Sequence, residues 1–199
     1  LAVEVLASSD RVRSICQNNG ARSITSATDP EERLRLWKGR KAAFAAAGKL
    51  SPNYFVQDGV IPRTQLVHVI REIEALGKKF DFSIANVFHA GDGNLHPLIL
   101  YDESVPGAFQ RVEELGGEIL KLCVDVGGSI SGEHGIGADK RCYMPNMFSE
   151  IDLETMQWVR HAFNPKELAN PGKVFPTPRT CGEGAHFHPS GGLDEGDRF

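Results

Sequence analysis

The sequence predicts an α+β fold in which helices cover a mostly antiparallel sheet. Apolar residues recur at helical spacing in several long segments, and short strand-like segments lie between them. The dipeptide Asp92-Gly93 stands between two apolar runs, a pattern typical of a β-hairpin because a type I′ turn needs positive φ at both central residues. The resulting order is helix, strand, helix, strand, helix, strand, strand, helix. Such an order favours a layer of helices on one antiparallel sheet.

Capping and turn residues divide the first half of the chain into elements. Asp29 precedes Pro30, which suits a helix start because aspartate caps free N–H groups and proline fits the first helical position. Pro62 precedes another helix, whose apolar stripe includes Val69 and Ile73. The expected elements are a helix to about residue 18, a strand over 22–27, a helix over 30–47, a strand over 54–57 and a helix over 63–80.

Glycine and proline also mark the ends of elements in the second half. Pro106-Gly107 precedes a long apolar-striped segment, and Gly127-Gly128 ends it. From Asn164 onward the chain is rich in proline and glycine and has no periodicity. The expected elements are hairpin strands over 82–90 and 95–101, followed by helices over 108–126, 138–144 and 149–162. We therefore expect one domain over 1–163 and a separate terminal segment over 164–199.

Composition limits the classes of protein to which the chain can belong. Its 199 residues suffice for one ordinary core, and a formal net charge of −4 gives no reason to expect a nucleic-acid partner. No apolar run approaches the ~18 residues of a membrane span, so we expect a soluble, cytoplasmic protein. The chain begins without methionine inside an apolar pattern, which predicts a fragment of a longer protein. Four cysteines without a CxxC spacing predict ordinary thiols: Cys16, Cys123, Cys142 and Cys181.

Two histidines flank the predicted hairpin turn. With Asp92-Gly93 as a two-residue loop, His89 lies directly opposite His96 on one sheet face, with Cβ atoms roughly 4.5–5.5 Å apart. Two imidazoles at that separation can bind one divalent ion, at about 2.0–2.1 Å from each nitrogen. A packed cross-strand pair without metal explains the hairpin equally well. The other histidines, His68, His161, His186 and His188, are interpreted as ordinary polar residues.

Glu133-His134 lies in a stretch that holds five glycines in eleven residues, 127–137. Glycine at this density permits close backbone approach to a ligand. A phosphate loop is disfavoured because no Lys-Ser/Thr pair follows the glycines and Glu133 would repel a phosphate. If Glu133 joins His89 and His96, the centre has two histidines, one glutamate and open positions, as catalytic metal sites do, and His134 becomes a candidate base. Zinc-assisted hydrolysis, Fe(II) oxygenation and metal-assisted alcohol oxidation all remain open.

Five segments together resemble the family of FAD-linked 2-hydroxy-acid oxidases and dehydrogenases, and its glycolate-oxidising members match best. The segments are 36–44 (LWKGRKAAF), 58–63 (DGVIPR), 86–97 (NVFHAGDGNLHP), 127–137 (GGSISGEHGIG) and 170–173 (NPGK). The resemblance implies that residues 1–163 are most of a ferredoxin-like cap, or substrate, domain. It also implies that residues 164–199 return to an N-terminal FAD-binding domain that this chain lacks.

The resemblance implies a role for individual residues. His89, His96 and Glu133 match the ligands of a divalent metal, usually zinc, and His134 matches the catalytic base. Arg40 matches the arginine that holds the substrate carboxylate, a task suited to a planar fork of donors.

Further roles implied by the resemblance concern the flavin and the substrate. Asn170 matches a residue that approaches the flavin, although a simple turn residue is the alternative. Phe44, Val56 and Leu98 stand where relatives that oxidise hydroxy-dicarboxylates carry polar residues. The pocket is therefore expected to prefer a short or apolar 2-hydroxy acid.

The resemblance implies FAD-dependent oxidation of a substrate such as glycolate or D-lactate to the 2-oxo acid. A D-2-hydroxyglutarate or D-lactate dehydrogenase-type relative is the alternative, as is a metal-binding module that is inactive in isolation. FAD would be held mainly by the absent domain, so the fragment alone is expected to be inactive. Implied partners are an iron–sulfur subunit and a second flavin-type subunit, through which the protein would lie at the periphery of the inner membrane.

Overall fold

The computed structural model describes residues 2–176, with side chains from residue 4 onward, and divides into two compact units that meet at residues 43 and 44. The first unit contains α1 (Ala2–Asn18) and α2 (Pro30–Lys41). The Asp29 side chain accepts the backbone N–H of Glu32 at 2.8 Å, which confirms the predicted start of α2. The strand expected over 22–27 is wrong: this stretch is irregular, and the described part of the first unit offers it no strand to pair with.

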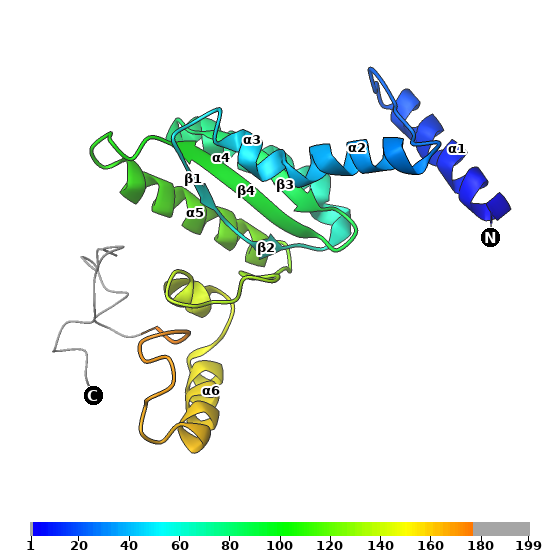
Figure 1. Cartoon of the computed structure of the whole chain (residues 1–199). Coiled ribbons are helices and arrows are strands. Elements are labelled where there is room, and N and C mark those ends of the chain that lie inside the picture. The colour runs from blue at the N-terminus through cyan, green and yellow to red at the C-terminus, as the bar shows by residue number, and fades with distance from the viewer. Residues whose placement is uncertain (1, 177–199) are drawn as a thin grey trace. The chain divides into compact units, whose positions relative to one another are not determined.

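The helix expected over 30–47 is interrupted at Ala42, and its last turns form a separate helix in the second unit. The second unit otherwise follows the predicted order of elements, with two differences: a short strand at Gly59–Val60 is added, and the helix expected over 138–144 is a 3-10 helix at Arg141–Asn146 (Figure 1). Its elements are α3 (Ala43–Ala47, from the last residue of the first unit), β1 (Asn53–Val56), β2 (Gly59–Val60), η1 (Arg63–Gln65), α4 (Leu66–Phe80), β3 (Ser83–His89), β4 (Asn94–Tyr101), α5 (Ala108–Asp125), η2 (Arg141–Asn146) and α6 (Glu150–Phe163).

The sheet is antiparallel throughout, which confirms the predicted α+β class. The central strand is β4; β3 pairs along one of its edges, while β1 and then β2 pair along the other. Both β1 and β2 keep the same register against β4, so the line of pairing continues across residues 57 and 58. The pairs that define this register are Val56 with Leu98 and Gly59 with Leu95.

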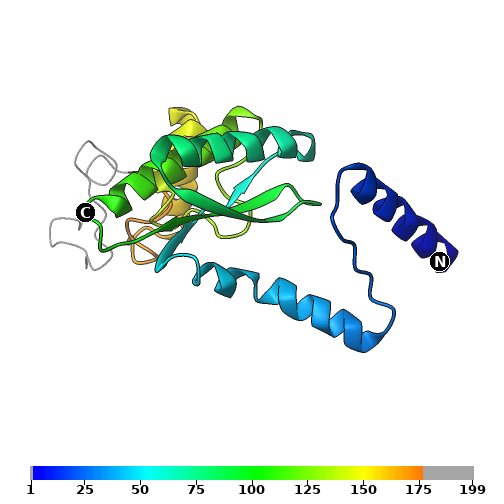
Figure 2. The same cartoon turned by 90° about the horizontal axis from the view of Figure 1, so that it is seen from above.

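One face of the sheet is covered by α4 and α5, which lie side by side in Figure 2. The odd-numbered residues Leu95 and Ile99 of β4 pack there against the apolar stripes of both helices, including Ile73 and Leu115. All four are at most 2 % exposed. Because burying one such side chain is worth about 1.5–3 kcal/mol, this layer holds the sheet in place and leaves the even-numbered face of β4 for other roles.

The hairpin turn is longer than predicted. His89 pairs with Asn94, so four residues, 90–93, form the turn instead of two. Asp92 keeps an ordinary φ, and Gly93 alone adopts a positive one, +73°. The carbonyl of Gly93 accepts the Ile61 N–H at 2.9 Å, and a Cβ on Gly93 would come within 2.1 Å of the Ile61 oxygen. A long-range backbone contact therefore sets this turn.

The segment after α5 packs as a second, smaller core of Leu120, Ile130, Met144 and Leu153. The last helix begins at a capping box in which Ser149 and Asp152 exchange side-chain and backbone bonds. Among the described residues, no helix combines the length and apolar character needed to cross a bilayer.

The cysteines depart in part from the prediction of ordinary thiols. Cys16 and Cys123 are free, whereas Cys142 is disulfide-bonded. The sequence did not predict this bond, because the spacing of cysteines does not reveal which of them meet in space. Cys181, His186 and His188 lie outside the described residues.

Candidate metal centre

The sheet face opposite α4 and α5 gathers the polar residues of the hairpin. The predicted pairing of His89 with His96 is wrong, since His96 lies opposite Val87. A register shift of two residues keeps every side chain on its face, so the two histidines remain diagonal neighbours. Their ring centroids are 5.4 Å apart and their planes nearly perpendicular.

One oxygen of Glu133 is the point where the histidines converge. Its Oε1 lies 2.8 Å from Nε2 of His96, 3.7 Å from Nε2 of His134 and 4.0 Å from Nε2 of His89. The rings of His96 and His134 are stacked, with centroids 5.1 Å apart. We call His89, His96, Glu133 and His134 the His/Glu cluster. The structure thus brings together all four residues that the sequence analysis assigned to the metal and the base.

The cluster is buried on one side and open on the other. His96 is only 3 % exposed, whereas the Glu133 side chain is 52 % exposed and those of His89 and His134 are similarly open. A hollow of about 400 Å³ adjoins it, lined by Val60, His89, Asp92, Asn94, Gly132 and Glu133. A small ligand can therefore reach the cluster from the side of the glycine-rich loop.

Asp58 lies beneath this loop and was not assigned any role from the sequence. It is 0 % exposed, and the shared register of β1 and β2 places it opposite His96. Its Oδ2 accepts the backbone N–H groups of residues 132, 133 and 134 at 2.9, 3.1 and 2.9 Å, as well as the Ser131 hydroxyl at 2.9 Å. A charged residue inside an apolar segment was the available signal, because aspartate is almost never fully buried without partners.

Lys140 completes the surroundings of Asp58. Its Nζ donates to the main-chain oxygen of Asp58 at 2.8 Å and lies 3.3 Å from Oδ2. Burial tends to raise the pKa of Asp58, but the three backbone N–H donors and the Lys140 ammonium outweigh it and hold this pKa well below its usual range. Burial also lowers the pKa of Lys140, an effect that the Asp58 carboxylate opposes. Asp58 is therefore a buried anion with its partners already in place.

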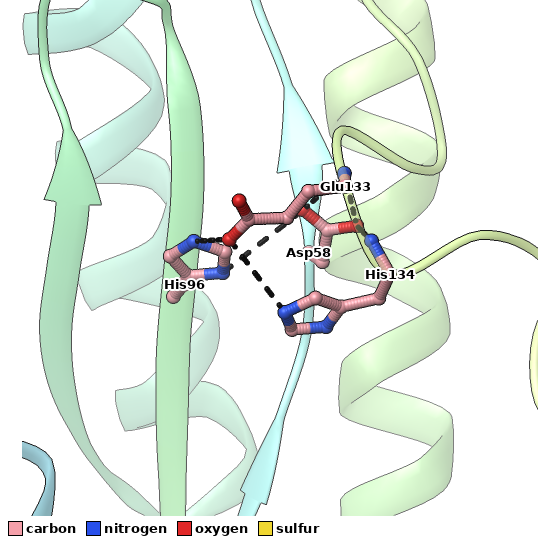
Figure 3. Close-up of side chains that lie close together, drawn as sticks. All are labelled: Asp58, His96, Glu133 and His134. Atoms are coloured by element: carbon pink, nitrogen blue, oxygen red, sulfur yellow. Dashed lines mark hydrogen bonds and ion pairs between the residues drawn. The ribbon is translucent and has the colours of Figure 1, made fainter.

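The donor set near Glu133 suits a divalent cation (Figure 3). One potential ligand atom from each of Asp58, His96, Glu133 and His134 lies within 4.8 Å of the others. Imidazole and carboxylate together are typical ligands of zinc and related metals. This group of four differs from the expected set of His89, His96 and Glu133, because it contains Asp58 and His134 in place of His89. His96 and Glu133 belong to both sets.

Arg40 and Asn170 belong to other elements than the residues of the His/Glu cluster. Arg40 belongs to α2 in the first unit, with its guanidinium carbon 5.4 Å from the ring centroid of Trp37. Asn170 adopts a left-handed conformation, φ +47°, in the turn after α6. Its carbonyl accepts Nη2 of Arg160 at 2.8 Å, and its Oδ1 lies 3.5 Å from Nζ of Lys173. These contacts are those of a turn residue. The role of Asn170 toward a flavin stays a prediction.

The three apolar residues expected to line the substrate pocket lie near His96. Val56 pairs with Leu98 across the sheet, and Leu98 follows His96 on the same face of β4. The Phe44 ring centroid is 6.3 Å from that of His96. His96 therefore has apolar neighbours on the side of Phe44 and Leu98.

The chain is similar to several curated oxidases and dehydrogenases. The chain is 51 % identical to the glycolate oxidase subunit GlcD of Escherichia coli, over 90 % of this chain and 36 % of that protein. It is 34 % identical to the D-lactate dehydrogenase of Archaeoglobus fulgidus, over 80 % of this chain and 35 % of the relative. It is 31 % identical to the mitochondrial D-lactate dehydrogenase (cytochrome) 1 of Saccharomyces cerevisiae, over 84 % of this chain and 29 % of the relative. The chain spans about a third of the length of these curated relatives.

Residues 3–174 match the family model described as FAD linked oxidases, C-terminal domain. This match extends over most of both units and overlaps every element described above. It confirms the resemblance drawn from the sequence segments. The chain therefore belongs to the FAD linked oxidases, C-terminal domain family.

Proposed function

We propose that the chain is the substrate-binding part of an FAD-dependent enzyme that oxidises a short 2-hydroxy acid to the 2-oxo acid. The observation that carries this proposal is the convergence of three imidazoles on Oε1 of Glu133, beside an open hollow, in a chain of the FAD linked oxidase family. The named relatives act on glycolate and D-lactate, both short 2-hydroxy acids. Residues 1–163 would form the cap domain, and 164–199 the terminal segment.

A divalent cation, zinc in our proposal, would be held by His96 and Glu133 together with His89. A bound cation lowers the pKa of a hydroxyl that coordinates it and orients the substrate. The open sides of Glu133 and His89 leave room for a small hydroxy acid in the hollow. The Phe44 ring, whose centroid lies 6.3 Å from that of His96, is an apolar neighbour of the proposed metal centre and favours a substrate without a second carboxylate.

His134 is the proposed base. Its ring stacks on His96, its Nε2 lies 3.7 Å from Oε1 of Glu133, and about half of its side chain is accessible. From this position Nε2 can receive the proton of the substrate 2-hydroxyl. FAD, when bound, would supply the complementary chemistry, which is acceptance of the C2 hydrogen with its electron pair. Arg40 is proposed to hold the substrate carboxylate and Asn170 to approach the flavin.

A subunit of a larger assembly is the proposed context. The relative from Escherichia coli is named as a subunit of glycolate oxidase, which supports association with further subunits. We propose an iron–sulfur subunit and a second flavin-type subunit as partners, in the cytoplasm at the periphery of the inner membrane. D-lactate is the second candidate substrate, because two of the relatives named above are D-lactate dehydrogenases.

A hybrid protein tests the proposal. The chain replaces the matching segment of Escherichia coli GlcD, and dye reduction is followed with glycolate, D-lactate and D-2-hydroxyglutarate. We expect oxidation of the two short acids and a loss of about 10²–10⁴-fold in kcat for His134→Ala, the range of general base catalysis. A hybrid that folds and holds FAD but oxidises none of these acids overturns the proposal. The isolated chain should bind no stoichiometric flavin, and flavin absorbance in it would contradict the cap assignment.

A further inference from the structure

We propose that Asp58 is the positioning residue of the metal centre and that it acts on both sides of the site without binding the ion. One oxygen of its carboxylate holds the loop that carries Glu133 and His134, and the other orients the ring of His96. This inference rests on the proposed metal centre. It deepens that proposal by naming the group that sets the geometry of the ligands and of the base.

Oδ2 of Asp58 holds the glycine-rich loop. Three consecutive N–H groups, those of residues 132–134, point at this single oxygen within 3.1 Å, and the Ser131 hydroxyl donates to it as well. The Ser131 oxygen in turn accepts the N–H of Gly135 at 2.8 Å. The backbone on both sides of Glu133 and His134 is therefore tied to one buried anion. Hydrogen bonds to a charged acceptor are stronger than neutral ones, so this contact restrains the loop effectively.

Oδ1 of Asp58 faces the ring of His96. Oδ1 lies 4.0 Å from Nδ1 of His96, and this nitrogen is buried with no hydrogen-bond partner among the described residues. The other nitrogen, Nε2, faces Glu133 at 2.8 Å. Histidines that bind metals through one ring nitrogen almost always donate the other to a carboxylate or carbonyl, which fixes the ring and its tautomer. Asp58 is the carboxylate on that side, and a small movement brings it into hydrogen-bond range.

The donors around Asp58 favour a positioning role over direct ligation of the ion. Asp58 belongs to the group of four potential ligands by distance alone. Its Oδ2 already has five donors, including the Lys140 ammonium at 3.3 Å. A divalent cation at this oxygen would displace the loop N–H groups and be repelled by Lys140. The charge of Asp58 is therefore directed to the loop and the lysine, while the ion is left to His96 and Glu133.

The experiment measures Asp58→Asn in the full 199-residue chain, with Asp125→Asn as the matched control. Asp125 is an exposed carboxylate that pairs with Lys121, so its replacement makes the same change of charge on the surface. The first readout is hydrogen exchange of the amides of residues 132–134 in the metal-free chain. We expect Asp58→Asn to accelerate exchange there while the amides of α5 stay protected, and Asp125→Asn to leave the loop unchanged.

The second readout is the binding of Co²⁺, whose visible spectrum reports the number and geometry of its ligands. We expect Asp58→Asn to weaken Co²⁺ binding by about 10–100-fold, as the loss of outer partners of metal ligands does, with the shape of the spectrum retained. If Asp58→Asn does not fold, Ser131→Ala removes one donor to the same oxygen without a change of charge. It should then show the same two effects to a smaller degree.

Four outcomes would overturn the inference. If exchange at residues 132–134 is as slow in Asp58→Asn as in Asp125→Asn, Asp58 does not restrain the loop. Unchanged Co²⁺ affinity would show that it does not position the ligands, and a spectrum with a lost ligand would make it a direct ligand. If the wild-type chain binds no divalent ion at all, the metal centre fails as proposed, and with it the positioning role. The exchange data then show separately whether the loop contact itself is real.

Discussion

Nε2 of His96 lies 2.8 Å from Oε1 of Glu133, and this contact joins a buried strand residue to a half-exposed loop residue. His89 reaches the same oxygen only at 4.0 Å. The two histidines therefore differ in how firmly the fold holds them near the proposed ion.

Alanine variants of the two histidines should weaken divalent metal binding unequally. We expect His96→Ala to lower Zn²⁺ affinity by more than ~100-fold and His89→Ala to lower it by about tenfold. The loss for His96→Ala would exceed the loss that is typical when a residue hydrogen-bonded to a metal ligand is removed. Competition titration with a chromophoric chelator measures both. His68→Ala, a change at an exposed histidine of α4, is the control and should leave the affinity unchanged. Equal losses from His89→Ala and His96→Ala would contradict this order.

Gly128→Ala should destabilise the second unit. A Cβ at Gly128 would come within 1.9 Å of the Val60 carbonyl oxygen and 2.6 Å of that of Cys123, where Val60 and Ser129 exchange backbone hydrogen bonds. Such overpacking costs about 1–3 kcal/mol or more. Urea unfolding measures the change in the free energy of unfolding. Gly91→Ala is the matched control, since Gly91 has open space and no positive φ, and a loss of equal size there would refute the steric argument.

Acid should remove the stability that the buried Asp58 carboxylate contributes. Its pKa is lower in the folded chain than the ~3.9 of an unfolded aspartate, so this contribution is fully present above pH ~4 and is lost as the pH falls below it. As the pH is lowered below ~4, the free energy of unfolding of the wild type should therefore fall toward that of Asp58→Asn. Urea unfolding at a series of pH values tests this. A difference between the two proteins that stays constant with pH would show that Asp58 is not the group responsible.

Cys16 and Cys123, the free cysteines within residues 2–176, should react differently with iodoacetamide. Burial raises the pKa of Cys123 to about 12, with Asp58 adding to the effect and Lys140 opposing it, so its reactive thiolate is scarce at pH 8. Cys16 is partly exposed and lies in the first unit. Mass spectrometry of the native chain should find label on Cys16 and little on Cys123, and label on both after urea unfolding. Rapid labelling of native Cys123 would contradict the buried, protonated thiol.

Local signals in the sequence predicted most helices and one strand pair correctly. The start of α2 at Asp29-Pro30 depends on contacts within one turn, as does the start of α6 at Ser149, so neighbouring residues determine them. The strand expected over 22–27 failed because a strand needs a partner, and partners are not a property of the segment itself. The length of the hairpin turn failed for a similar reason, since Gly93 is held by Ile61 from outside the hairpin.

The sequence by itself determined the α+β class, the sheet face shared by His89 and His96, and the chemical types of the proposed ligands. It could do so because side-chain alternation along a strand survives a register shift of two residues. Only the tertiary structure decided that His96 is the buried member of the cluster and that Asp58 lies beneath Glu133 and His134. Those relationships join residues far apart in the chain, and the packing of β2, β4 and the loop after α5 creates them.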